Sequence, residues 1–264
     1  MSKSLKIFLL AASGFVALLI FIAVALVVFT DANAYKPRLE ATASAAFGME
    51  VRIDGRLGIG FSPGLHLTLR DVHILNRGAD IITTKEARIE VDLLSLLRKE
   101  IHARNIALKQ PIISIERDND GTFNFKIPDS TGATSPALDL TKLSISDASF
   151  LYADKQSGEG FEVEDCSLVL FRPHLSSGLS RGIMKNLSFT GTLACGEIRA
   201  KRFAASDLKI AAEGSDGVID FKTVTMSFFG TQGSGNILAD FSGATPAYII
   251  RYSMPEFQIK EAFK

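Results

Sequence analysis

The pattern of apolar and polar residues divides the chain into one long apolar segment and a long alternating remainder. Residues 7–29 are almost continuously apolar, interrupted only by Ser13 and Gly14. As a helix that rises about 1.5 Å per residue, this segment would be roughly 34 Å long, enough to cross a hydrocarbon core of about 30 Å. Most of the remainder alternates with the period of two that is typical of β-strands. The pattern therefore predicts one membrane anchor that carries a β-rich body.

A cleavable signal peptide is the alternative interpretation of residues 7–29. Ala32-Asn33-Ala34 fits a cleavage pattern, and the lysines within residues 1–6 form a positive leading region. The apolar region of a signal peptide is usually about 7–15 residues long, however, and this one is far longer. We therefore favour an uncleaved signal anchor. The lysines before the span and Asp31 after it favour a cytoplasmic tail of residues 1–6 and an exported body.

Residues 35–47 have the pattern of a short amphipathic helix. Asn33 is a suitable N-cap, Pro37 falls in the first turn and Gly48 can end the helix. One helix face would present Leu39, Ala43 and Phe47. We expect this helix to cap the following sheet rather than lie on the membrane surface.

The alternation predicts about 14 strands after this helix. Asp54-Gly55 is a strong signal for a hairpin turn, and Gln110-Pro111 predicts a second turn. Near Arg70-Asp71 the apolar residues change phase, which suggests a β-bulge. Residues 93–99 break the alternation and predict about two helical turns.

A segment rich in Pro, Ser, Thr, Gly and Ala, residues 128–137, predicts a linker. It divides the body into a first β segment, residues 30–127, and a second β segment, residues 138–264. Open twisted sheets rarely exceed about 10 strands without curling. The predicted fold class is therefore mainly β with an N-terminal transmembrane helix: an elongated, curled antiparallel sheet with an open groove and few short helices. A closed sandwich is the alternative.

The charge and the cysteine content bear on which partners the protein can bind and in which redox compartment it folds. Lys plus Arg and Asp plus Glu are equal at 29 each, so no net positive charge attracts nucleic acid. Cys166 and Cys195 both fall on the apolar phase of their strand patterns. Buried free thiols are the favoured interpretation, and a disulfide formed in an oxidising compartment is the alternative.

The motifs that could carry chemistry fail on their context. Residues 178–182 match the G-x-S-x-G pattern of hydrolases, but no histidine follows His174 in the chain. The histidines also lack the spacing of metal ligands. We therefore predict no catalytic residue, no cofactor-binding residue and no metal site, and we do not expect an enzyme.

Several short phrases, taken in order, resemble the AsmA family. They are DANAYKP at residues 31–37, IDG at 53–55, the strand pattern of 61–76, the phrase of 106–125 that contains Pro111, Arg117-Asp118 and Gly121, and later phrases at 206–209 and 229–248. The sequence departs from the family pattern at Ala32, where proline is usual, and at Met49, where arginine is usual. Family members are usually much longer than 264 residues, so the resemblance implies a short member or a fragment.

The resemblance implies an inner-membrane protein of a Gram-negative envelope, single-pass, with its N-terminus cytoplasmic and its body periplasmic. The family is linked to outer-membrane assembly and to the regulation of protein targeting to membranes. Its larger relatives resemble bridge-like lipid-transfer proteins in which a β-groove shields acyl chains.

Two functions remain open at this point. In the first, an apolar β-groove shields or transfers the acyl chains of phospholipids, because the strands are rich in Phe and Leu and carry no chemical motif. In the second, the body is a non-enzymatic scaffold or regulator that contacts envelope proteins. Nucleic acid is not an expected partner. The candidate groove residues are Leu67, Leu69, Ile113, Ile115, Phe123, Phe125, Leu168, Phe189 and Leu193.

Overall fold

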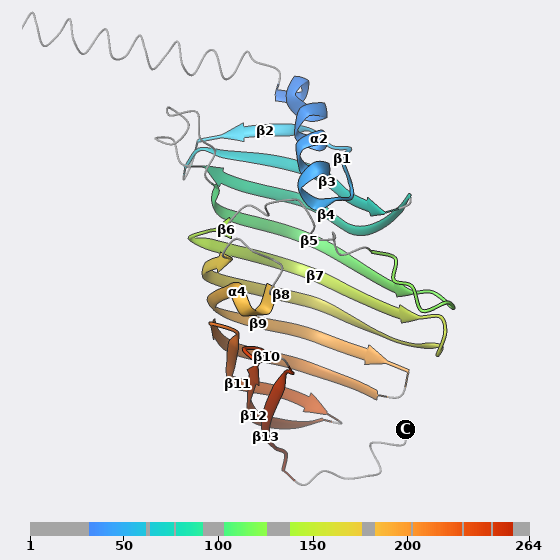
Figure 1. Cartoon of the computed structure of the whole chain (residues 1–264), viewed down its shortest axis with the longest axis vertical. Helices are drawn as coiled ribbons and strands as arrows, with labels where there is room; N and C mark the ends of the chain where they lie inside the picture. The colour runs from blue at the N-terminus through green and yellow to red at the C-terminus, as the bar shows by residue number, and fades with distance from the viewer. Residues whose placement is uncertain are drawn as a thin grey trace, which may run out of the picture.

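The described part of the chain is one open β-sheet that curls along its length (Figure 1). The computed structural model describes residues 32–61, 64–76, 78–91, 103–125, 138–175, 183–201, 203–228, 230–243 and 245–255. Within these residues, thirteen strands belong to a single sheet. The prediction of a mainly β, open and curled fold is therefore confirmed, and the closed sandwich is not observed.

Few helical elements accompany the strands within the described residues. They are η1 (Ala32–Tyr35), α2 (Lys36–Phe47) and α4 (Ile183–Asn186). The strands are β1 (Glu50–Ile53), β2 (Leu57–Gly60), β3 (His66–Asn76), β4 (Ala79–Val91), β5 (Ala103–Arg117), β6 (Leu138–Asp139), β7 (Lys142–Asp154), β8 (Glu159–Leu175), β9 (Leu187–Ala200), β10 (Phe203–Ser215), β11 (Val218–Phe228), β12 (Thr231–Asp240) and β13 (Ala247–Ser253).

The sheet follows the chain closely, in the order β1-β3-β4-β5-β7-β8-β9-β10-β11-β12-β13. β2 also pairs with β3, and the short β6 pairs with β8. Every described pair is antiparallel except β5 with β7, which is parallel from Asn105 opposite Lys142 to Arg117 opposite Asp154. The prediction of a wholly antiparallel sheet is wrong at this point. The predicted linker, 128–137, lies outside the described residues, and the sheet is continuous from the strands before it to the strands after it.

Helix α2 covers the free edge of the first strands. The backbone N–H of Ile53 donates to Glu40 Oε1 at 2.7 Å, and that of Val51 donates to Ser44 Oγ at 2.8 Å. Glu40 and Ser44 are four residues apart and lie on one helix face, just as Val51 and Ile53 are two apart on one strand edge. An edge strand with unpaired N–H groups invites pairing with another chain, and here a helix supplies the acceptors. The predicted capping role of this helix is confirmed.

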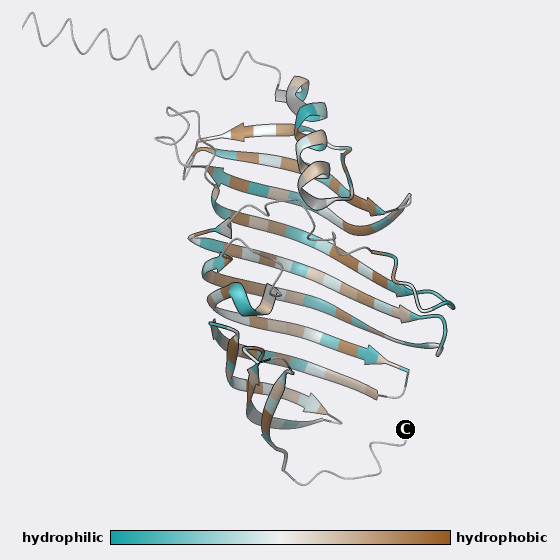
Figure 2. Ribbon diagram, viewed as in Figure 1, coloured by the Kyte–Doolittle hydropathy of each residue, from teal (hydrophilic) through white to brown (hydrophobic). Residues whose placement is uncertain are grey.

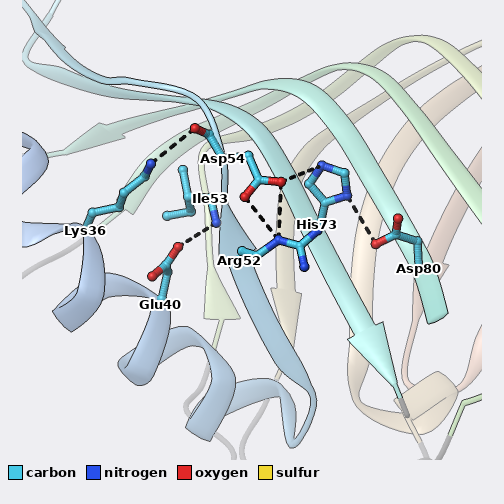
Figure 3. A network of polar contacts seen from close by, with 7 residues as sticks. All are labelled: Lys36, Glu40, Arg52, Ile53, Asp54, His73 and Asp80. Carbon is cyan, nitrogen blue, oxygen red and sulfur yellow. Dashed lines mark hydrogen bonds and ion pairs between the residues drawn. The ribbon is translucent and has the colours of Figure 1, made fainter. Parts of the chain in front are cut away.

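A network of charged groups lies beside the contact between α2 and β1 (Figure 3). Lys36 Nζ donates to the carbonyl oxygen of Asp54 at 3.3 Å, and Arg52 Nε lies 3.1 Å from the Asp54 carboxylate. His73 lies between two acids, with Nε2 3.6 Å from Asp54 Oδ2 and Nδ1 3.1 Å from Asp80 Oδ1. The network joins α2 and β1 to β3 and β4.

The predicted N-cap and the first predicted turn differ from the structure. Asn33 lies in η1, and its Oδ1 accepts a hydrogen bond from the backbone N–H of Leu57 at 3.0 Å. Asp54-Gly55 does not form a hairpin, because β1 and β2 both pair with β3 and the chain runs on between them. A Cβ at Gly55 would lie 2.6 Å from the carbonyl oxygen of Arg70. The glycine therefore allows the chain to pass close to the backbone of β3, and it does not form a chain reversal.

The change of phase predicted near Arg70-Asp71 is confirmed: Asp71 has a φ of 50° and lies unpaired between the Arg70–Glu86 and Val72–Thr84 pairs, although the register with β4 does not shift there. We call such a positive-φ residue within a strand a bulge. The turn predicted at Gln110-Pro111 is wrong, because β5 continues through it with Gln110 at a φ of 51°. The predicted anchor, 7–29, and the predicted helical turns at 93–99 lie outside the described residues. Among the described helices, none has the length and apolarity needed to cross a membrane.

Candidate functional site

Rows of apolar side chains cross the sheet from strand to strand. Residues directly opposite each other on neighbouring strands point to the same face. One row consists of Leu57, Leu69, Ala87, Leu108, Ile145, Leu168, Leu193, Ile210 and Val224. The next row on this face consists of Ile59, Leu67, Ile89, Ile106, Leu143, Leu170, Gly191, Ala212, Phe221, Ile237 and Ile250. We call this surface the apolar face. Its apolar positions recur along successive strands in Figure 2.

A third row continues the apolar face beyond a line of bulges. It consists of Val51, Ile74, Ile82, Ile113, Phe150, Val163, Ile198, Ala205 and Phe228. Between this row and the first, the sequence changes phase, and five strands carry a residue with positive φ there. These residues are Asp71, Gln110, Asp147, Asp165 and Asp207. In a regular strand, a change of phase by one residue would place the following apolar side chains on the opposite face. The bulge takes up the extra residue, so these side chains stay on the apolar face.

The first and third rows meet in a depression of about 290 Å³ on the apolar face. Strands β5, β7, β8, β9 and β10 contribute to it, and almost all of its lining side chains are apolar. Among them are Ile113, Ile145, Phe150, Leu168, Leu193 and Leu208. Ile113 and Phe150 come from beyond the bulges, and Ile145 and Leu168 come from before them. The depression therefore confirms that the first and third rows share one face. Such a surface can hold a hydrocarbon ligand but offers few partners to a polar one.

Most of the predicted groove residues lie on this face. Seven of the nine are on strands with their side chains in or beside the three rows: Leu67, Leu69, Ile113, Ile115, Leu168, Phe189 and Leu193. Phe123 and Phe125 follow β5 in a bent segment, where only Phe123 makes a bridge, to Arg117. Their rings are 5.4 Å apart. The alternation of Phe123 and Phe125 with polar residues predicts a strand, but among the described residues it forms only the bridge of Phe123, so this prediction is wrong there. Ile113, Leu168 and Leu193 are the three that meet in the depression.

Several equivalent positions were missed by the sequence prediction. Leu108 and Ile145 are in the same row as Leu168, and Ile106, Leu143 and Leu170 are in the next. A period-two pattern places each of them on an apolar phase within its own strand. The pattern does not give the register between strands. The register determines which residues lie opposite each other, and so whether the apolar residues of neighbouring strands share a face.

A model of the AsmA family matches residues 1–216. The chain belongs to the AsmA family. The matched region includes the predicted anchor and reaches just beyond the end of β10. A comparison with curated proteins found no match. The phrases at 229–248 that resemble a later repeat of the family lie beyond the matched region.

In this AsmA-family protein the two cysteines form a disulfide between β8 and β9. The favoured prediction of free thiols is therefore wrong. Ser167 pairs with Ala194, which places Cys166 directly opposite Cys195 on the neighbouring strand, with a Cα–Cα separation of 4.0 Å. Side chains that are directly opposite on antiparallel strands share a face and lie close enough to bridge. Both cysteines line the apolar depression.

The opposite face, which we call the polar face, has a different composition. The row beside Leu69 and Leu168 on that face consists of Thr68, Arg88, Ala107, Ser144, Val169, Thr192, Ala211 and Thr223. Arg199 forms ion pairs with Glu164 at 2.5 Å, with Glu197 at 2.6 Å and with Glu162 at 3.4 Å. The contacts with Glu164 and Glu197 raise the pKa of its guanidinium. Within the described residues, no group of acids, histidines and cysteines is placed to hold a metal ion.

Proposed function

We propose that this AsmA-family protein is anchored in the inner membrane, with its body in the periplasm, and that the apolar face shields phospholipid acyl chains in transit during outer-membrane biogenesis. The observation that carries the proposal is the set of unbroken apolar rows, which cross the strands of an open sheet. The rows contain buried members such as Leu57 and Val224, but the two ends of the second row are accessible: Ile59, in β2, is 42% exposed and Ile250, in β13, is 65% exposed. The proposal assigns the protein no catalytic step.

The energetics favour a ligand of this kind. Each methylene group exposed to water costs about 0.8 kcal/mol, so an acyl chain of about 16 carbons costs on the order of 12 kcal/mol. A carrier must therefore offer apolar contact without gaps. With neighbouring strands about 4.8 Å apart, the second row, which has a member on each of eleven strands, extends for roughly 50 Å, and the first and third rows, with nine strands each, extend for roughly 40 Å.

The disulfide and the predicted anchor support the proposed compartment. Stable disulfides form in oxidising compartments such as the periplasm and are rare in the cytosol. The Cys166–Cys195 bond therefore fits an exported body, which is the orientation that the residues flanking the predicted span favour.

The second candidate is a non-enzymatic scaffold or regulator that contacts envelope proteins. The observation that favours it is the presence of large exposed apolar side chains on the polar face as well, notably Ile112 and Phe171. β13 is also exposed at all seven of its positions. Exposed apolar side chains and open strand edges are features of protein-binding surfaces.

Site-specific photocrosslinking of the full chain in its native membrane separates the two candidates. A photoreactive phenylalanine analogue would replace Leu168, on the apolar face, or its neighbour Val169, on the polar face. We expect phospholipid adducts at position 168 and at least tenfold fewer at position 169. Protein adducts at position 168, with no lipid adduct there, would favour the scaffold and reject lipid shielding.

A further inference from the structure

A hollow of about 300 Å³ lies on the polar face beside β2. It is lined by three arginines, Arg56, Arg70 and Arg88, together with Thr68 and Glu86. The pairing of Thr68 with Arg88 and of Arg70 with Glu86 shows that the side chains from β3 and β4 share this face. The hollow is thus on the opposite side of the sheet from Leu67 and Leu69, and it is distinct from the apolar depression.

Two glycines keep the hollow open. In β2, Leu57 and Ile59 point to the apolar face, while Gly58 and Gly60 occupy the positions that face the hollow. A Cβ at Gly60 would collide with the imidazole of His66, whose Nδ1 donates to the carbonyl oxygen of Gly64 at 2.8 Å. A Cβ at Gly58 would lie 3.8 Å from the Cβ of Thr68, in ordinary contact. The floor of the hollow at β2 is therefore backbone rather than side chain.

The hollow has more positive than negative charge. Glu86 is its one lining carboxylate, with Oε2 3.8 Å from Arg70 Nε and Oε1 3.4 Å from a terminal guanidinium nitrogen of Arg88. Arg56 makes no ion pair with any described residue. Three guanidinium groups against one carboxylate leave a formal charge of +2 among the lining residues. Each guanidinium presents a planar fork of N–H donors, which matches the oxygens of a phosphate group.

The hollow also lies close to the point where the chain would leave the bilayer. The predicted span ends at residue 29, and Asn33 is hydrogen-bonded to Leu57 of β2 at 3.0 Å. Four residues reach at most about 14 Å when fully extended. If residues 7–29 cross the membrane, β2 and the hollow are therefore near the lipid headgroups.

We infer that the hollow binds the phosphate of an anionic phospholipid headgroup at the membrane surface. A lipid held there by its headgroup lies across the edge strand β2, whose other face presents Leu57 and Ile59, the first members of two apolar rows. The hollow is then the entry point to the apolar face. This inference rests on the proposed function for the source of its ligand. A free phosphate ion has the same oxygen chemistry, and two probes of different structure separate the two sources.

The test uses the full chain in a non-ionic detergent and two water-soluble probes. Glycerophosphoglycerol is the deacylated headgroup of phosphatidylglycerol, and inorganic phosphate is the free ion. Calorimetry gives the affinity, and protection of individual arginines from phenylglyoxal, read by peptide mass spectrometry, gives the location. We expect glycerophosphoglycerol to protect Arg56, Arg70 and Arg88, and to leave Arg251 of β13 unprotected.

Four variants make the test specific. Removing one charge with Arg56→Gln should weaken binding about tenfold, since a charge-assisted hydrogen bond is lost. Glu86→Gln removes the competing carboxylate and should strengthen binding several-fold, a gain that misfolding would not produce. Gly58→Leu keeps every charge but fills the hollow, and should abolish binding. Arg251→Gln, at the opposite end of the sheet, is the control and should change nothing.

The outcomes separate this inference from the proposed function. If the affinity for the probes is the same in Arg56→Gln and Glu86→Gln as in the parent protein, the hollow is not the binding site. Binding of inorganic phosphate without glycerophosphoglycerol would overturn the assignment to a lipid headgroup. If neither probe binds while position 168 still forms lipid adducts, the hollow is rejected and acyl-chain shielding stands. If the headgroup probe binds while position 168 forms no lipid adduct, acyl-chain shielding is rejected and the headgroup site stands.

Discussion

Leu168 and Val169 are neighbours on β8, yet they belong to opposite faces of the sheet with different neighbours. On one side, Leu168 is paired with Ile145 and Leu193. On the other side, Val169 is paired with Ser144 and Thr192. The apolar row extends across the sheet with only aliphatic side chains as far as Val224, whereas the polar row alternates small, hydroxylated, charged and apolar side chains. The same strands thus build one surface suited to hydrocarbon and one suited to water.

The bulges explain how this separation survives along strands of up to 17 residues. Each bulge adds one residue to a strand, and the added side chain is aspartate in four of the five cases and glutamine in the fifth. Four of these residues, Asp71, Gln110, Asp147 and Asp165, line a hollow of about 480 Å³ on the polar face. The extra residue that changes the phase of each strand is therefore polar and, in these four strands, lies on the polar face. The apolar face continues on both sides of the line of bulges.

The largest expected effect comes from the disulfide, which joins β8 to β9 on the apolar face. In the chain-entropy account, a cross-link between residues separated by 29 positions stabilises the folded state by about 3–4 kcal/mol. Replacing Cys166 and Cys195 together by serine should lower the free energy of unfolding by about that amount in urea titrations. Ser167→Ala, on the neighbouring polar-face position, should change it by less than about 0.5 kcal/mol. An unchanged stability in the double variant would show that the bond contributes little to the sheet.

A pair of charges on the apolar face should remove lipid binding. Leu168→Lys combined with Leu193→Lys places two ammonium groups at paired positions within the depression. Because an acyl chain cannot satisfy these charges, we expect bound phospholipid to fall at least tenfold. The matched control, Val169→Lys with Thr192→Lys, adds the same charges to the same two strands on the polar face. Equal lipid losses in the two pairs would contradict the difference between the faces.

The bulge at Asp147 should tolerate glycine and reject a β-branched residue. Its φ of 53° lies in the left-handed region, where a β-branched side chain is strained. Asp147→Val should therefore lower the free energy of unfolding by about 1–2 kcal/mol, while Asp147→Gly should leave it nearly unchanged. Thermal unfolding of both variants measures the difference. Equal stability of the two would mean that the bulge is not what keeps Ile145 and Phe150 on one face.

The smallest effect is a pH dependence at the end of the β7–β8 hairpin. Burial of Asp154 opposes its ionisation, but hydrogen bonds from the backbone N–H groups of Ser157 and Gln156, and from Arg117, outweigh it and lower its pKa. A carboxyl whose pKa is lower in the folded than in the unfolded state adds stability at neutral pH, and that stability is lost as pH falls below about 4. Urea midpoints between pH 5 and pH 2.5 should therefore fall less steeply in Asp154→Asn. The same slope in the variant and the parent would reject the assignment.

Local patterns predicted those features that depend on a few neighbouring residues. The capping helix followed from Pro37 in its first turn and Gly48 at its end, although Asn33 is not its N-cap, and the bulge at Asp71 followed from a change of phase. The same change of phase at Gln110-Pro111 was interpreted as a turn, because polar residues and proline occur in both turns and bulges. Only the partner strand distinguishes them: β4 runs past Gln110 on one side and β7 on the other, so the chain cannot reverse there.

Features that depend on register could not be predicted from local patterns. The pairing of Cys166 with Cys195 requires Ser167 to face Ala194. The parallel pairing of β5 with β7 depends on where the chain returns after a long connection, about which periodicity says nothing. For the same reason, the sequence predicted the apolar positions within each strand separately. The rows that join these positions into one surface became visible only in the structure.

The most direct test of lipid shielding measures what the body carries when it leaves the membrane. A protease site inserted between residues 30 and 31 of the full chain would release the body from washed membranes without detergent. Solvent extraction of the purified body and lipid mass spectrometry then give the ratio of phospholipid to protein. We predict near-stoichiometric phospholipid, reduced at least tenfold by the Leu168→Lys and Leu193→Lys pair. A folded, monodisperse body that carries no lipid would contradict the account.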